Sequence, residues 1–221
     1  MLIFCSVSYT HLEVMSIDRS FEAALLKSIR SLEAGLTGLY LPGAEQMDDR
    51  ELSHLIMYPD DRRLLAVAEG LRRGMTVEQL YELTKIEPFF LEKIKNIVDF
   101  ETLFAQKAAS GLANVSRDIM AQAKELGFSD AILASLAQVP EQDVLAYRES
   151  LGIIPVYKMV DTCAAEFDAV TPYYYSCYDQ EDEAPFSPHK KVVVLGSGPI
   201  RIGQGIEFDY CSVHSVWARC V

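Results

Sequence analysis

Helical signals follow one another from residue 20 to residue 152, and this succession constrains the fold more than any other feature of the sequence. Ser20 is placed to cap the first helix, and Gly35 is placed to end it. Thr76 and Gln79 form a capping box, and Pro88 suits the first turn of the longest helix. Because the connections between helices are short, residues 20–152 predict an all-α bundle.

The predicted starts of the other helices are Asp48 or Asp49, Asp60 or Asp61, Ser116, Ser129 and Pro140. The apolar stripes of these helices, with Phe89 and Phe90 among them, are expected in the core. The arginine pairs at 62–63 and 72–73 are expected on solvated faces. A bundle of this kind is typical of an interaction domain.

The pattern changes on both sides of the bundle. Residues 13–18 alternate like a strand, and we assign residues 1–19 to a leader and the end of an upstream domain. Residues 155–160 and 173–178 are β-branched or aromatic and predict extended segments, while residues 181–188 are acidic and contain proline. Residues 153–190 are therefore expected to form an extended connector.

Residues 190–211, KKVVVLGSGPIRIGQGIEFDYC, combine the signals of a strand, a glycine loop and a helix. The run at 192–195 is typical of a parallel strand buried on both faces, and residues 207–217 can form a helix. Loop amides and a helix N-terminus can together bind an anion. The glycine spacing fits neither a P-loop nor the dinucleotide-binding fingerprint, so a tight turn whose glycines serve only packing is an equal alternative.

Two charged positions in this stretch have alternative roles. Arg201 could bind a carboxylate or phosphate, or it could bridge to Glu207 or Asp209. The two acidic residues favour the positive end of the helix, which is a stabilising role.

The sequence stops within the first helix after the predicted strand. A parallel strand needs neighbours that are joined by long crossovers, so residues 191–221 are expected to be the truncated start of an α/β domain. We expect this segment to be loosely held or to lie against the bundle, and to promote aggregation through its exposed apolar strand. The predicted fold class is mainly α, with a helical bundle, an extended connector and a truncated α/β unit.

Charge and cysteine content exclude several classes of function. The net charge is −12, so neither nucleic acid nor an anionic membrane surface is an expected partner. The five cysteines are odd in number and lack paired spacing, so we expect no disulfide framework or zinc site and a cytoplasmic location. Cys163 and Cys177 are expected to be buried structural thiols, and His54 and His189 lack partners at ligand spacing.

Three ordered motifs resemble one family. Residues 196–211 resemble the loop that opens the second, carbamoyl-phosphate-forming half of the carbamoyl phosphate synthetase large subunit. Residues 156–167 (VYKMVDTCAAEF) and 171–178 (TPYYYSCY) resemble the connector before that loop. The resemblance runs from about Glu13 to Ala218, and it implies that the chain is an internal piece of that subunit whose bundle is the oligomerisation domain.

The resemblance implies a parent enzyme that makes carbamoyl phosphate from bicarbonate and glutamine-derived ammonia, for arginine and pyrimidine synthesis. That enzyme would need ATP, Mg or Mn, and a small glutaminase subunit. The nucleotide and metal ligands would lie outside this chain, so no catalytic residue, cofactor-binding residue or metal ligand is assigned and the chain alone is expected to be inactive. Self-association through the helical domain is its expected role.

By the same resemblance, the glycine loop borders the passage that carries carbamate between active sites. A bulky residue in place of Gly205 would obstruct that passage, and Ser197 and Ile200 depart from the family pattern. The candidate residues are Gly196, Gly198, Arg201, Gly203, Gly205 and Glu207.

Two other functions remain open from the sequence. A stand-alone helical interaction module would leave the glycine loop incidental. A nucleotide-binding oxidoreductase ranks third, and nucleotide binding by the chain would favour it.

Overall fold

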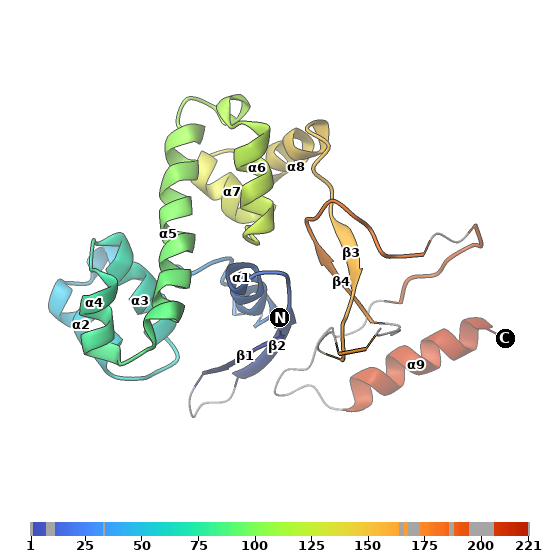
Figure 1. The fold of residues 1–221 in the computed structure, drawn as a ribbon, viewed down its shortest axis with the longest axis horizontal. Coiled ribbons are helices and arrows are strands. Elements are labelled where there is room, and N and C mark those ends of the chain that lie inside the picture. Colours follow the sequence, from blue (N-terminus) through green and yellow to red (C-terminus); the bar gives the residue numbers. More distant parts are fainter. Residues whose placement is uncertain are drawn as a thin grey trace.

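The computed structural model describes residues 2–7, 12–32, 34–163, 166–167, 173–185, 188–194 and 206–220. The helices of residues 21–150 form one body, two separate two-stranded hairpins lie beside it, and a last helix ends the described chain (Figure 1). The mainly α fold class is thereby confirmed.

An N-terminal hairpin precedes the bundle. Strand β1 (Leu2–Val7) pairs antiparallel with β2 (Leu12–Ile17), which confirms the strand expected near residues 13–18. β2 lies against the first helix, α1 (Phe21–Ser31) (Figure 1). The buried Ser16 hydroxyl donates to the Ala24 carbonyl at 2.6 Å and lies 2.7 Å from the Ser28 hydroxyl, so the strand is tied to the helix by hydrogen bonds.

With the exception of α3 (Arg63–Arg72), the helices of the bundle begin where the capping residues predict. The bounds are α1 Phe21–Ser31, α2 Asp49–Met57, α3 Arg63–Arg72, α4 Val77–Thr84, α5 Pro88–Ala108, α6 Arg117–Glu125, α7 Asp130–Ala137 and α8 Glu141–Ser150. Short 3-10 turns, η1 Ala44–Gln46 and η2 Leu112–Asn114, lie between helices. Side-chain caps form at Ser20, Asp48, Thr76, Ser116 and Ser129, and those at Asp48 and Thr76 are capping boxes. These predicted starts are confirmed.

Two predicted helix boundaries are wrong. Gly35 adopts a positive φ of 74°, but α1 already ends at Ser31, so this glycine turns the loop after the helix. α3 begins at Arg63 rather than at Asp60 or Asp61. The Asp60 carboxylate accepts from the Arg62 amide at 2.8 Å, which stabilises a turn before the helix instead of a helix cap.

The longest helix, α5, lies at the centre of the bundle. It contacts α1, α3, α4, α6 and α7, with α2 to α4 near one end and α6 to α8 near the other (Figure 1). Its side chains Leu91, Ile97 and Phe104 are fully buried. Phe104 packs beside Phe100, whose ring is 5.4 Å from that of Phe128 in the loop before α7. The core is therefore continuous from one group of helices to the other.

The expectation that Phe89 and Phe90 belong to the core is wrong. Their exposed fractions are 51% and 43%, although both rings contact Phe21. The two residues lie in the first turn of α5, and the buried stripe of this helix begins at Leu91. The periodic apolar pattern therefore extends one turn beyond the region that neighbouring helices cover.

The connector forms a second hairpin. β3 (Val156–Met159) pairs antiparallel with β4 (Tyr174–Cys177), which confirms both extended segments. The acidic residues after β4 fold back along β3. The Glu183 amide donates to the Tyr157 carbonyl at 2.9 Å, and the Glu183 carboxylate accepts from the Met159 amide at 2.8 Å. The chain is thus held to the hairpin as far as residue 183.

The C-terminal region differs from the strand prediction. Residues 192–194 form no strand, and the exposed fractions of Val192 and Val193 are 68% and 80%. No described strand lies beside them, so the hydrogen bonds of a sheet have no partner there. Leu195 lies outside the described residues. The helix expected at residues 207–217 is confirmed as α9 (Ile206–Cys220).

Candidate functional site

Most of the predicted site residues lie outside the described part of the chain. These are Gly196, Gly198, Arg201, Gly203 and Gly205. The backbone of Glu207 lies in the first turn of α9, as the sequence predicts. The anion-binding and passage-lining roles of the loop therefore stay predictions.

His54, Cys163 and Cys177 show no arrangement for catalysis in the described residues. His54 is exposed and packs on Tyr58 with 4.4 Å between ring centroids. Cys177 is buried, and burial raises the pKa of its thiol. Cys163 is only half-buried, because the strand β3 ends before it, so its expected burial is wrong. Within the described ranges, no three acidic, histidine or cysteine side chains gather as metal ligands.

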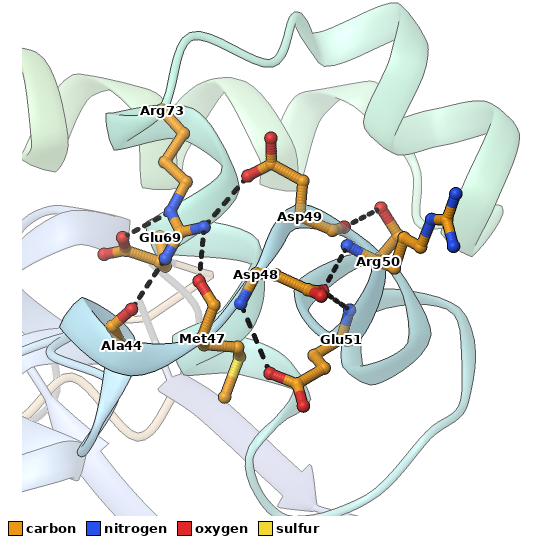
Figure 2. Close-up of polar contacts among 9 residues, drawn as sticks. Ala44, Met47, Asp48, Asp49, Arg50, Glu51, Glu69 and Arg73 are labelled. Atoms are coloured by element: carbon orange, nitrogen blue, oxygen red, sulfur yellow. Dashed lines mark hydrogen bonds and ion pairs between the residues drawn. The ribbon is translucent and has the colours of Figure 1, made fainter.

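Arg73 is exposed, as expected, and it binds the loop before α2. Its guanidinium donates to the carbonyls of Ala44 and Met47 and to the carboxylates of Glu69 and Asp49, at 2.7 to 3.1 Å (Figure 2). Asp48, next to this network, caps α2 (Figure 2). One side chain at the end of α3 therefore fixes the chain that leads into α2.

Arg72, also expected on a solvated face, reaches inside the bundle. Its guanidinium donates to the Glu101 carboxylate at 2.8 Å and to the Leu39 carbonyl at 2.8 Å, and lies 4.6 Å from the Tyr40 ring centroid. Burial raises the pKa of Glu101 despite this partner. Burial and the neighbouring Glu101 also raise the pKa of Tyr40. The contacts link α3, α5 and the loop after α1, which is a structural role.

A third cationic group lies where the bundle meets the connector. Asp130 accepts from Lys124 at 2.7 Å and from Arg148 at 2.8 Å. Burial lowers the pKa of Lys124, although Asp130 opposes this effect. Tyr178 follows β4, and its ring lies 4.9 Å from the Lys124 ammonium and 5.8 Å from the Arg148 guanidinium. The connector therefore docks on buried cations of the bundle.

Large apolar side chains are exposed at the end of α2, on α4 and at the start of α5. Arg63 donates to the Ile56 carbonyl at 2.9 Å and to the Thr84 carbonyl at 3.0 Å, which joins the ends of α2 and α4, and α5 starts just after α4. We call the exposed residues here the aromatic end: Met57, Tyr58, Tyr81, Phe89 and Phe90. Because several large apolar residues are exposed on these neighbouring helices, this end is suited to contact another protein surface.

Sequence reasoning missed both the aromatic end and the role of the arginines. The apolar pattern of a helix does not indicate which of its turns lacks a neighbouring element. The position of an arginine in the sequence likewise does not indicate whether its side chain faces water or binds a loop carbonyl. In the described part of the chain, the helices are too short or too polar to cross a membrane.

Comparison with known proteins assigns most of the chain. Residues 13–152 match the family described as carbamoyl-phosphate synthetase large chain, oligomerisation domain. Residues 188–219 match the carbamoyl phosphate synthase preATP-grasp domain. The carbamoyl phosphate synthase large chain of Archaeoglobus fulgidus is 50% identical over 208 residues, which cover 93% of this chain and 19% of the relative. The resemblance seen in the sequence is confirmed, and the chain belongs to the carbamoyl phosphate synthetase large-chain family.

Proposed function

We propose that this chain acts within a carbamoyl phosphate synthetase large chain and that its bundle mediates self-association. The observation that carries this proposal is the match of residues 13–152 to an oligomerisation domain. The chain spans about a fifth of the relative's length, 19%, so the reaction belongs to a larger protein. That reaction would be ATP-dependent synthesis of carbamoyl phosphate from bicarbonate and glutamine-derived ammonia, for arginine and pyrimidine synthesis.

The aromatic end is the proposed contact surface between two copies. Tyr58 is 57% exposed, and Phe89 and Phe90 form an edge-to-face pair at the start of α5. Burying such rings against a second copy would remove apolar area from water. Lys93 lies 5.6 Å from the Phe89 ring centroid, so a cation borders the aromatic residues.

Sedimentation velocity over a range of protein concentrations tests this surface. We expect the average mass of the unmodified chain to rise with concentration. The average mass of the double variant Tyr58→Asp, Phe90→Asp should rise less. Trp217→Asp is the matched control, because Trp217 is 61% exposed but lies on α9. If the double variant associates as strongly as the unmodified chain, the assignment of this surface is wrong. If the unmodified chain stays monomeric at every concentration, the proposed self-association is wrong.

We propose that the chain alone is inactive and cytoplasmic. In the complete enzyme, ATP and Mg or Mn would be held by other domains, and a small glutaminase subunit would supply ammonia. Replacing the matched segment of the Archaeoglobus fulgidus relative with this chain tests its place in the synthetase. We expect the chimera to form carbamoyl phosphate, whereas a stand-alone interaction module would leave it inactive.

The glycine loop supports a second test in the same chimera. Gly205→Phe is expected to impair carbamoyl phosphate formation and to leave bicarbonate-dependent ATP cleavage largely intact, because the added ring would obstruct the proposed carbamate passage. Gly205→Ala, with a much smaller side chain, is the control. Equal loss of both activities would contradict a role in the passage.

A further inference from the structure

Four of the five connector residues 175–179 contact cations that lie on the helices of the bundle or just before them. The Lys27 ammonium of α1 donates to the Ser176 carbonyl at 2.8 Å and lies 5.7 Å from the Tyr175 ring centroid. Arg19, just before α1, binds the Asp179 carboxylate at 3.1 Å. Lys124 of α6 and Arg148 of α8 lie over the Tyr178 ring. We call these four cations the cationic socket.

Three of the four cations in the socket are also held by bonds outside residues 175–179. Lys27 also binds the Asp18 carboxylate at 2.7 Å and donates to the Ile17 carbonyl at 2.8 Å. Lys124 donates to the Phe128 carbonyl at 2.7 Å, and Arg148 donates to the Ile153 carbonyl at 3.0 Å. Because these three cations are already oriented, the connector can dock on them without ordering long side chains, which lowers the entropic cost of the contact.

We propose that the cationic socket is a docking site for residues 175–179 and that Tyr178 is its main positioning residue. Tyr178 is the residue in this segment that contacts two buried cations, and both cations share the carboxylate of Asp130. An aromatic ring near two buried cations gains more electrostatic attraction than a ring near exposed cations would. The salt bridge of Arg19 is more exposed and contributes less.

Docking has a consequence for the chain that follows. The residues up to Glu183 are hydrogen-bonded to the hairpin, and the segment that matches the preATP-grasp domain begins at residue 188. Only a short stretch therefore separates the docked hairpin from that segment. The socket thus sets the direction in which the chain leaves the bundle, and this inference does not depend on the activity of a complete enzyme.

Cys177 provides a direct probe of docking. Its side chain is 5% exposed, and it lies between Ser176 and Tyr178, which both contact the socket. A cavity of about 220 Å³ borders it. A maleimide carrying a polyethylene glycol chain is too large for this cavity, so it should react with Cys177 only when the hairpin leaves the bundle.

The experiment measures the labelling rate of the complete chain in which Cys5, Cys163, Cys211 and Cys220 are replaced by serine. Each rate is divided by the rate of the same chain in denaturant, which corrects for the intrinsic reactivity of the thiol. We expect Tyr178→Ala to raise the corrected rate by about tenfold, because two cation–π contacts are lost. Tyr178→Phe keeps the ring and should label nearly as slowly as the parent.

Two further variants separate docking from general damage. Lys27→Met removes the contact of α1 with the Ser176 carbonyl and should also raise the rate. Tyr157→Ala lies on the same hairpin, where Tyr157 is 48% exposed, and should leave the rate unchanged. Circular dichroism in each case confirms that the bundle stays folded. Slow labelling in both Tyr178→Ala and Lys27→Met, or equally fast labelling in Tyr157→Ala, would overturn the proposal.

Discussion

The bundle and the C-terminal region contain similar apolar residues, but only the bundle covers them. Val67 on α3 is fully buried, whereas Val193 is 80% exposed. On α9, Tyr210 and Trp217 are exposed by 62% and 61%. The difference shows that an apolar pattern determines which residues can be buried. Whether a given residue is buried depends on the elements that pack against it.

The largest effect is expected in the centre of the bundle. Phe104 is fully buried on α5, so Phe104→Ala removes apolar contacts and leaves a cavity. The free energy of unfolding should fall by about 4 kcal/mol, as measured by denaturant titration. Trp217→Ala on α9 is the comparison and should change it by less than about 0.5 kcal/mol. Equal losses would mean that α9 is part of the cooperative core.

Gly127 tests the contact between α1 and the loop after α6. Gly127 has a φ of +88°, and an added Cβ would lie 2.5 Å from the Cα of Ala23. Gly127→Ala should therefore lower the free energy of unfolding by about 3 kcal/mol through backbone strain and overlap. Gly152→Ala has a similar φ of +71° with nothing within 4 Å, and should cost only about 1 kcal/mol. Similar costs at both sites would rule out the overlap.

Asp130 tests the charge at the base of the cationic socket. Burial alone would raise the pKa of Asp130, but Lys124 and Arg148 lower it. Its charge therefore stabilises the fold fully above its unfolded pKa of about 3.9, and this stabilisation is lost as the pH falls through the lower folded pKa. Asp130→Asn should cost about 2 kcal/mol at pH 7, since two cations lose their partner.

Thermal or denaturant unfolding at a series of pH values measures this dependence. The difference between parent and Asp130→Asn should shrink below about pH 4, where the parent becomes protonated as well. Asp99→Asn is the control, because Asp99 is exposed and should have little effect at any pH. A difference that stays constant down to the most acidic pH would contradict the role of the charge.

The cap of α4 should have a smaller effect. The Thr76 hydroxyl accepts from the Gln79 backbone amide at 3.3 Å, and the Gln79 side-chain oxygen accepts from the Thr76 backbone amide at 2.9 Å. Thr76→Ala should lower the free energy of unfolding by about 1 kcal/mol. Thr76→Ser keeps the hydroxyl and should retain most of the stability that Thr76→Ala loses. Equal losses of stability in the two variants would contradict the role of the cap.

The smallest effect on stability is expected at Val193. Val193→Asp replaces an exposed side chain and should change the free energy of unfolding by less than about 0.5 kcal/mol. It should still slow aggregation, because a charge replaces part of an exposed apolar run. Light scattering at constant temperature measures this effect, with Ser212→Asp on α9 as the control for added charge. Aggregation at the parent rate would contradict the proposed role of this run.

Local signals predicted much of the bundle. Ser20, Thr76, Ser116 and Ser129 cap helices because the cap is made within a few residues of the sequence. The exposure of Phe90 and the inward contacts of Arg72 could not be predicted, since both depend on elements distant in the sequence. The connector strands were predicted, but their docking through Tyr178 was not, because α6 and α8 supply the partners.

The inward placement of cations affects how two copies approach each other. Arg72, Lys124 and Arg148 bind groups within the bundle, while the chain as a whole carries a net charge of −12. Two copies therefore repel at long range before any apolar surfaces meet. Salt shortens the range of that repulsion, to about 8 Å at physiological ionic strength. Association of this chain should accordingly strengthen with ionic strength, the opposite of an interface held by ion pairs.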